Sequence, residues 1–249
     1  MRRVDWSKRC PQCWMHWRLC LCEQAPRLKV DTGLVLLMDR REACQTTNTG
    51  HMAPLVLERS KVVVTSRQEP PDDKLQGIVE SGRRAVLLFP GHGAQVLTPQ
   101  WLEGHSEPLT LVVPDATWRV ARRTMRKSAI LRRMQPVVLP PGPPARWYLR
   151  RPPEPGVIST LEAIARAMGV LEGQHVEQAL MKVLRMMVQR HMWSKGLLEP
   201  EALVDGVPPP LPSGWTSPQR PFQRGFAPLI EADGPDKPWR GRSDDLNGD

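Results

Sequence analysis

Two groups of residues in this chain have the types and the spacing that chemistry requires. The first centres on Asp115, which follows the apolar run 109–113 and a proline, and precedes Thr117, Trp118 and a strongly basic segment. The apolar run predicts a short buried strand, and the Pro-Asp pair predicts a tight corner at its end. Asp115 is therefore a candidate general base or, alternatively, a helix N-cap for the amides of residues 117 and 118. The residues alone favour neither interpretation.

The second group is a cluster of cysteines with the spacing C-x2-C-x6-C-x-C. Its members are Cys10, Cys13, Cys20 and Cys22. Four thiolates form a closed tetrahedral site that suits structural Zn2+, although His16 could replace one of them. The alternative is a set of reduced thiols without a metal, but such crowding in a cytosolic chain favours metal. A metal would stabilise a segment that has little apolar core of its own.

Composition restricts the class of protein. The chain has 249 residues, a hydrophobic content of 40% and a formal net charge of +9. These values fit one ordinary domain with appended segments, and the positive charge favours polyanions such as nucleic acid, or anionic membrane surfaces. No apolar run reaches the roughly 18 residues that a membrane-spanning helix needs, and the first residues lack the apolar core of a signal peptide. We expect a cytoplasmic protein with no membrane partner.

The remaining chain alternates short apolar runs with amphipathic segments. Strands are predicted at 33–38, 62–65, 85–89, 109–113 and 135–140. Helices are predicted at about 118–134, after the capping box that begins at Ser159, and at about 172–193.

This alternation indicates an α/β domain. We expect three parts: a Cys-rich zinc-binding segment at 1–27, a catalytic domain at 28–199, and a Pro- and Gly-rich irregular tail at 200–249.

The predicted helix at 118–134 carries an apolar stripe that begins at Trp118. We expect this side chain to anchor the helix in the core, and the alternative is that it forms a wall of the pocket. The rest of its surface is basic, with no acidic residue in the same stretch. A solvated face usually mixes both signs of charge, so this face favours phosphate contacts over a merely soluble surface. The predicted RNA-binding residues are Arg119, Arg122, Arg123, Arg126 and Lys127.

Three other segments are weaker candidates. The run Thr47-Asn48-Thr49-Gly50 is rich in turn formers, and we interpret it as a turn and helix cap rather than as a ligand site. The basic and aromatic segment 146–151 either holds a carboxylate or phosphate, or forms a surface loop. The capped helix N-terminus at Ser159 is explained by structure alone, but it also suits an anion.

Taken together and in this order, these motifs resemble the DTW domain family of tRNA-uridine aminocarboxypropyltransferases. The segment 115–118, Asp-Ala-Thr-Trp, matches the D-x-T-W signature. The matching elements on either side are the cysteine cluster, Glu42 with the Thr-Asn-Thr-Gly run, Leu88-Phe89-Pro90, Tyr148-Leu149-Arg150 and Ser159-Thr160-Leu161-Glu162-Ala163. The family usually has His-Pro before the glutamate, where this chain has Arg40-Arg41, so we assign no role to Glu42.

The resemblance implies a mostly parallel sheet flanked by helices, related to the SPOUT enzymes and carrying a C-terminal trefoil knot. It also implies transfer of the 3-amino-3-carboxypropyl group from S-adenosylmethionine to N3 of a uridine in tRNA, with Asp115 as base. Expected donor contacts are Leu88, Pro90, Leu139, Tyr148, Arg150, Ser159, Thr160 and Glu162. A SPOUT-like RNA methyltransferase and a non-catalytic zinc-dependent RNA-binding protein remain as alternatives, and the choice between monomer and homodimer is open.

Overall fold

The computed structural model describes residues 6–66, 71–79, 81–145, 149, 157–208 and 210. Within these residues, six strands form one sheet in the order β2-β1-β5-β3-β6-β4, and every neighbouring pair is parallel. The strands are β1 (Gly33–Asp39), β2 (Ser60–Thr65), β3 (Arg84–Leu88), β4 (Gln95–Val96), β5 (Leu109–Asp115) and β6 (Gln135–Val138). The predicted α/β class and the mostly parallel sheet are therefore confirmed.

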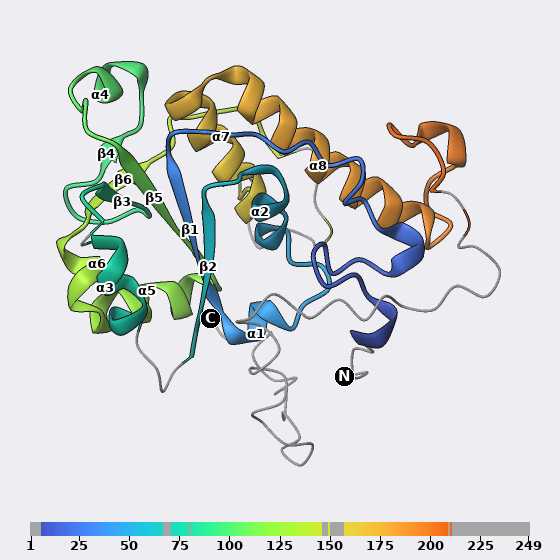
Figure 1. Ribbon diagram of the computed structural model, residues 1–249, viewed down its shortest axis with the longest axis horizontal. Coiled ribbons are helices and arrows are strands. Elements are labelled where there is room, and N and C mark those ends of the chain that lie inside the picture. The colour runs from blue at the N-terminus through green and yellow to red at the C-terminus, as the bar shows by residue number, and fades with distance from the viewer. Residues whose placement is uncertain are drawn as a thin grey trace, which may run out of the picture.

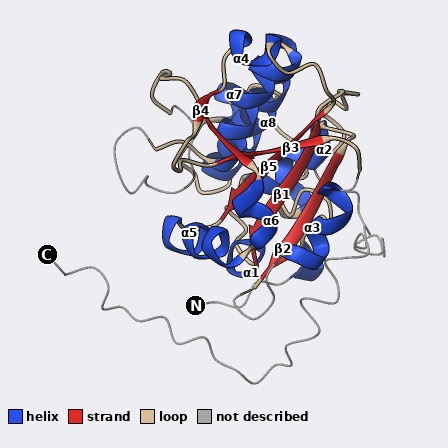
Figure 2. Ribbon diagram, turned by 90° about the vertical axis from the view of Figure 1, so that its left-hand side faces the viewer, coloured by secondary structure: helices blue, strands red, loops and turns tan. Residues whose placement is uncertain are grey.

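Helices cover both faces of the sheet (Figures 1 and 2). They are α1 (Arg40–Ala43), α2 (Ala53–Val56), α3 (Asp72–Val79), α4 (Pro99–Glu103), α5 (Trp118–Lys127), α6 (Ala129–Arg133), α7 (Thr160–Glu172) and α8 (Gln174–Trp193). Short 3-10 helices occur at η1 (Trp6–Lys8), η2 (Trp17–Leu19), η3 (Gly50–Met52) and η4 (Pro200–Ala202). No helix among the described residues is both long enough and apolar enough to cross a bilayer.

The alternation of side chains along β1 shows how the two helical layers form. Leu34 and Leu36 belong to a core shared with α2, α7, α8 and the cysteine segment, whereas Val35 and Leu37 belong to a core shared with α3 and α6. Successive residues of a strand point to opposite faces, so an uninterrupted apolar run predicts a strand that is buried on both sides. This is the environment of β1.

The predicted strands agree with β1, β2, β3, β5 and β6 to within two residues at each end. Strand β4 was not predicted, because it has only two residues and both are exposed. The prediction of a single helix at 118–134 is wrong, because the helix is interrupted at Ser128, between α5 and α6. The hydroxyl of Ser128 accepts from the amide of Leu131 at 3.1 Å and donates to Asp72 Oδ1 at 2.6 Å. These side-chain bonds satisfy a helix start that the apolar periodicity does not reveal.

The expectation that Trp118 anchors its helix in the core is also wrong. Its side chain is 46% exposed and lies against Phe89, with the ring centroids 5.6 Å apart. Trp118 is the first residue of α5 and follows the end of β5 closely, so the first turn of this helix lies at the carboxyl edge of the sheet.

The predicted tail at 200–249 lies mostly outside the described residues, which end at 210. The part that is described folds back onto α8. Gln189 donates to the carbonyl of Ala202 at 2.8 Å and accepts from the amide of Val204 at 3.0 Å.

Candidate active site and metal centre

Asp115 ends β5 and is held on both carboxylate oxygens. The amide nitrogen of Asn48 donates to Oδ2 at 2.6 Å, and the hydroxyl of Thr160 donates to Oδ1 at 2.7 Å. The side chain is only 4% exposed, so it does not point into bulk solvent. The N-cap position of α5 belongs to Thr117, and not to Asp115. The carboxylate therefore lies where three segments of the chain meet at the carboxyl edge of the sheet.

The turn at 47–50 supplies one side of this meeting point. Thr49 is the N-cap of η3, in line with the predicted turn, but Asn48 and Gly50 face Asp115. A Cβ built on Gly50 would lie 2.7 Å from Asp115 Oδ2, closer than real side chains approach. Only a glycine fits here without displacing the carboxylate, and no local sequence signal indicates this long-range contact.

His51 is a residue of this site that sequence reasoning missed. Its backbone N–H donates to Asn48 Oδ1 at 3.1 Å, and its ring Nε2 lies 2.7 Å from the carbonyl oxygen of Cys13. The ring stacks on Trp14 with centroids 4.0 Å apart and planes 8° from parallel. Burial lowers the pKa of His51 to about 4, so the ring is neutral near pH 7. A carbonyl oxygen can only accept, so the ring proton lies on Nε2.

The four cysteines predicted to bind metal are brought together. Their Sγ atoms all lie within 4.8 Å of one another, with Cys10 Sγ 3.6 Å from Cys22 Sγ and Cys13 Sγ 3.7 Å from Cys20 Sγ. A tetrahedral site with Zn–S bonds of about 2.3 Å has S···S edges of about 3.8 Å. His16 is not a member of this cluster, since it caps η2 by accepting from the amide of Arg18 at 3.3 Å.

The crowding of the thiols also fits a cation. Hydrogen bonds among the four thiols raise the pKa of Cys13 and Cys22 and lower the pKa of Cys10 and Cys20, and burial opposes the ionisation of all four. Neighbouring thiolates repel one another in a buried site, whereas a divalent cation allows all four to ionise. The cluster is therefore compatible with metal binding.

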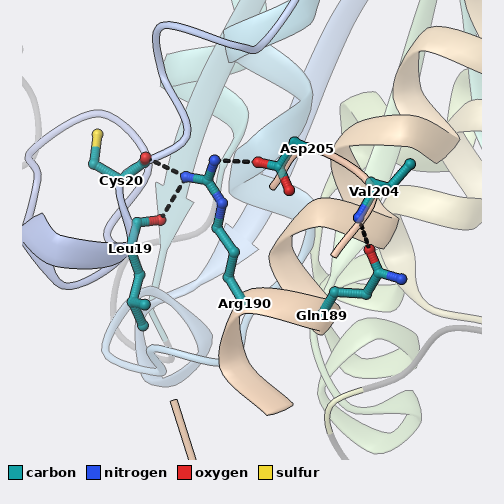
Figure 3. A network of polar contacts seen from close by, with 6 residues as sticks. All are labelled: Leu19, Cys20, Gln189, Arg190, Val204 and Asp205. Carbon is teal, nitrogen blue, oxygen red and sulfur yellow. Dashed lines mark hydrogen bonds and ion pairs between the residues drawn. The ribbon is translucent and has the colours of Figure 1, made fainter. Parts of the chain in front are cut away.

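A buried arginine of α8, Arg190, holds the second half of the cysteine segment against that helix (Figure 3). Arg190 of α8 is completely buried and donates to the carbonyl oxygens of Leu19, at 3.2 Å, and Cys20. Its guanidinium also pairs with Asp205, which follows η4. The segment that carries the cysteines thus packs between α8 and the turn that reaches Asp115.

The chain was compared with models of known protein families. The DTW domain model matches residues 7–192, which is most of the chain. The chain belongs to the DTW domain family. The family resemblance inferred from the motifs is therefore confirmed, and residues 7–192 form the DTW domain.

Several curated relatives of this DTW domain protein are named tRNA-uridine aminocarboxypropyltransferases. The chain is 29% identical over 183 residues to tRNA-uridine aminocarboxypropyltransferase 2 of Drosophila melanogaster, a match that covers 71% of this chain and 72% of the fly protein. It is 26% identical over 182 residues to the protein of that name from Macaca fascicularis, covering 71% and 61%. It is 26% identical over 215 residues to tRNA-uridine aminocarboxypropyltransferase A of Arabidopsis thaliana, covering 72% and 79%.

Among solved structures, the SAM-dependent rRNA:acp-transferase Tsr3 from Vulcanisaeta distributa matches 80% of this chain and 95% of its own. The identity is 16% and the TM-score is 0.37, a likeness too weak to support an argument about this chain.

The residues expected to contact a donor occupy three places in the DTW domain. Ser159 is the N-cap of α7 and accepts from the amide of Glu162 at 3.3 Å, while Thr160 contacts Asp115. Leu88 ends β3, and Leu139 follows β6; both are half-buried. Pro90 is exposed in the loop after β3, and Tyr148 and Arg150 lie outside the described residues.

Glu162, in the first turn of α7, is a buried carboxylate that is only partly satisfied. Only 2% of its surface is exposed, and its Oε1 pairs with Arg166 at 2.5 Å. Its Oε2 is buried and has no hydrogen-bond partner among the described residues. A buried acceptor without a partner is costly, so it marks a place where a ligand donor would be stabilised.

The basic residues of α5 in the DTW domain reach solvent as predicted for a polyanion-binding face. Arg119, Arg122, Arg126 and Lys127 are exposed, and Arg123 is half-buried. The basic surface continues onto α6, where Arg132 and Arg133 help to line a groove of about 610 Å³ at the amino ends of β3 and β6. This groove lies at the opposite edge of the sheet from Asp115, because all strands run parallel.

Proposed function

We propose that this chain is a tRNA-uridine aminocarboxypropyltransferase, which moves the 3-amino-3-carboxypropyl group of S-adenosylmethionine to N3 of a uridine in tRNA. Membership of the DTW domain family, together with relatives that carry this name, supports the activity. The observation that supports the site most directly is Asp115, buried at the carboxyl edge of a parallel sheet with both oxygens held by neutral donors. Open α/β sheets bind ligands at this edge.

In the proposed reaction, the uridine N3 forms a bond to the donor carbon attached to sulfur at the end of the aminocarboxypropyl chain. The carbon–sulfur bond breaks, and its electron pair leaves with methylthioadenosine. The proton on N3 passes to Asp115, which acts as general base. Asn48 and Thr160 donate to this carboxylate and accept nothing from it in the base form, so they keep it oriented as an acceptor.

We assign the donor's amino acid end to the start of α7. The capped N-terminus of a helix favours a carboxylate, and Ser159 and Thr160 are the residues at this end. Glu162 Oε2, which is buried without a partner in the described part of the chain, would accept from the donor's ammonium group. Leu88, Pro90 and Leu139 would contact the adenosyl group, and Arg150 with Tyr148 remains a prediction.

We assign Zn2+ to the four cysteines as a structural ion. Four sulfurs with tetrahedral edges leave no open position, so the ion would take no part in the transfer. Its contribution would be to stabilise the segment at 10–22 in its packed position.

For tRNA, we assign the basic face of α5 and the exposed ring of Trp118 beside it. Arg119, Arg122, Arg123, Arg126 and Lys127 would contact phosphates, and an exposed aromatic ring near Asp115 offers a stacking surface. The C-terminal trefoil knot and the cytoplasmic location implied at the outset stay predictions.

One experiment separates this function from its alternatives. The protein is incubated with unmodified tRNA and S-adenosylmethionine labelled in the carboxyl carbon or, separately, in the methyl carbon. We expect only the carboxyl label on RNA, a 3-amino-3-carboxypropyl uridine in nucleoside mass spectrometry, and release of methylthioadenosine. Methyl label on RNA would instead identify a methyltransferase. Absence of both labels, with no calorimetric binding of S-adenosylmethionine, would leave a non-catalytic RNA-binding protein.

The base assignment has its own variant. Asp115→Asn keeps the shape of the side chain but cannot accept the N3 proton, so we expect kcat to fall by a factor of about 100 or more. Binding of S-adenosylmethionine and the circular dichroism spectrum should stay close to wild type. Near-normal turnover of this variant would remove Asp115 from the reaction.

A further inference from the structure

We propose that Asn48 is the positioning residue of Asp115, and that the metal-binding cysteine segment holds Asn48 in place through His51. The proposal rests on the proposed function, because it takes Asp115 as the base. It assigns the cysteine segment a second task, beyond local stability. The observation that carries it is an unbroken series of buried polar contacts from Cys13 to Asp115.

The orientation of the Asn48 amide is fixed by its neighbours. The backbone N–H of His51 can only donate, and it faces Asn48 Oδ1 at 3.1 Å. The Nδ2 group must then face Asp115 Oδ2, at 2.6 Å. A flipped amide would place oxygen against carboxylate and NH2 against N–H, so both contacts would become repulsive. Asn48 is 2% exposed, so bulk solvent could not compensate such a flip.

His51 is held as firmly as Asn48. Its Nε2–H donates to the carbonyl oxygen of Cys13, and its ring is stacked on Trp14. The other ring nitrogen lies 3.2 Å from Asn48 Oδ1, the same oxygen that accepts from the His51 backbone N–H. Rotation of the ring would break the contact with Cys13, and movement of the backbone would release Asn48.

Cys13 is itself fixed twice. Its sulfur belongs to the four-cysteine cluster, while its carbonyl receives the His51 ring. The far side of the same segment is held by Arg190 through the carbonyls of Leu19 and Cys20 (Figure 3). Because the segment is held at both ends, the Cys13 carbonyl has a fixed position, and it limits the movement of His51 and of the turn that carries Asn48. Mutation of a group that orients a metal ligand typically lowers metal affinity or activity by a factor of about 10 to 100, and we expect the same range for a group that orients a catalytic carboxylate.

The discriminating experiment compares Asn48→Ala with Asn48→Asp in the metal-loaded protein. We expect kcat to fall roughly 10- to 100-fold in Asn48→Ala, with an unchanged KM and calorimetric Kd for S-adenosylmethionine. Asn48→Asp preserves the volume but replaces the donor by a second carboxylate, so we expect it to lose at least as much. A residue that merely fills space would give the opposite order. Gln95→Ala, which removes a side-chain amide on the edge strand β4, serves as the control with unchanged kcat.

The link to the cysteine segment is tested by His51. His51→Gln retains an N–H that can reach the Cys13 carbonyl, whereas His51→Leu does not, so we expect Gln to rescue most of the rate that Leu loses. In a double-mutant cycle, His51→Leu should add little to Asn48→Ala, because it acts through Asn48. Full additivity of the two losses would overturn the link.

A readout independent of turnover completes the test. A crystal structure of Asn48→Ala should show the Asp115 side chain displaced or in more than one rotamer. An unmoved Asp115, or a kcat within twofold of an active wild type, would overturn the positioning role. If the wild type transfers no group to tRNA, the proposed function fails, and the crystal structure alone still decides whether Asn48 positions Asp115.

Discussion

Gly50 and Asp115, which lie 65 positions apart in the chain, are in such close contact that a Cβ on Gly50 would lie 2.7 Å from Asp115 Oδ2. That Cβ would also lie 3.1 Å from the methyl carbon of Thr160. The glycine therefore lets the turn at 47–50 approach the carboxylate closely enough for Asn48 to bind it. No other small residue would leave that geometry intact.

This contact gives a variant that moves Asp115 without deleting a polar group. Gly50→Ala should lower kcat roughly tenfold or more, because the carboxylate must shift to avoid the new methyl group. The matched control is Gly77→Ala in α3, where a Cβ would meet nothing within 4 Å. Alanine is the better helix former, so the control should be at least as stable as wild type by thermal melting. Equal kcat in the two variants would contradict the close contact.

The buried pair between Arg190 and Asp205 should contribute much more to stability than the exposed pair between Arg84 and Glu107. Removing one partner of a buried pair leaves an uncompensated charge, so Arg190→Leu should cost about 3–5 kcal/mol in urea unfolding. Arg84→Ala, at a pair whose side chains are 38% and 41% exposed, should cost about 1 kcal/mol or less.

Arg190 also holds the carbonyls of Leu19 and Cys20, so its loss should weaken metal retention. We expect Arg190→Leu to lose metal to a chelator faster than Arg84→Ala does, as measured by a colorimetric zinc indicator. The double variant Arg190→Leu/Asp205→Leu should recover part of the stability but not the metal retention. Equal metal loss from both single variants would mean that the arginine does not support the cysteine segment.

The basic face of α5 predicts a salt-dependent affinity for tRNA. Arg122→Gln and Arg126→Gln should each weaken binding and reduce the slope of log K against log salt by roughly 1, since each removes one phosphate contact. Fluorescence anisotropy with tRNA at several salt concentrations measures both effects. Lys182→Gln, exposed on α8 across the sheet, should leave the slope unchanged. A loss of affinity without a change in slope would argue against phosphate contacts.

The stability of the protein should depend on pH through His191. Burial, followed by the charges of Lys195 and Arg9, lowers the pKa of His191 in the folded protein to about 4, from an ordinary value of 6.5. Between these values the unfolded chain binds a proton that the folded protein does not. The associated stability is therefore complete above pH 6.5 and is lost as the pH falls toward 4, at about 1.4 kcal/mol per pH unit at most.

The variant His191→Leu should reduce the slope of this dependence and leave the part that His51 contributes, whereas His92→Ala, in an exposed loop, should not change the slope. Urea unfolding of the three proteins at several values between pH 7 and pH 4.5 measures the effect. A curve for His191→Leu that is as steep as the wild-type curve would assign the dependence to other groups, such as His51.

Local pattern determined a large part of this protein. Short apolar runs predicted five strands, and two of these runs became β1 and β5, which are buried on both faces because such strands need consecutive apolar residues. The spacing of Cys10, Cys13, Cys20 and Cys22 predicted a cluster because a metal site formed by one short segment is a local feature. The D-x-T-W segment and the motifs around it identified the family because each of them is also a short, local stretch of sequence.

Only the tertiary structure decided which residues hold Asp115. Asn48 and Thr160 reach the carboxylate from 67 and 45 positions away, and His51 reaches Cys13 across 38. In the sequence they look like a turn, a helix start and an ordinary histidine. Their roles arise from parallel strands that bring distant loops to one edge of the sheet, and a pattern that is read along the chain carries no information about which loops meet there.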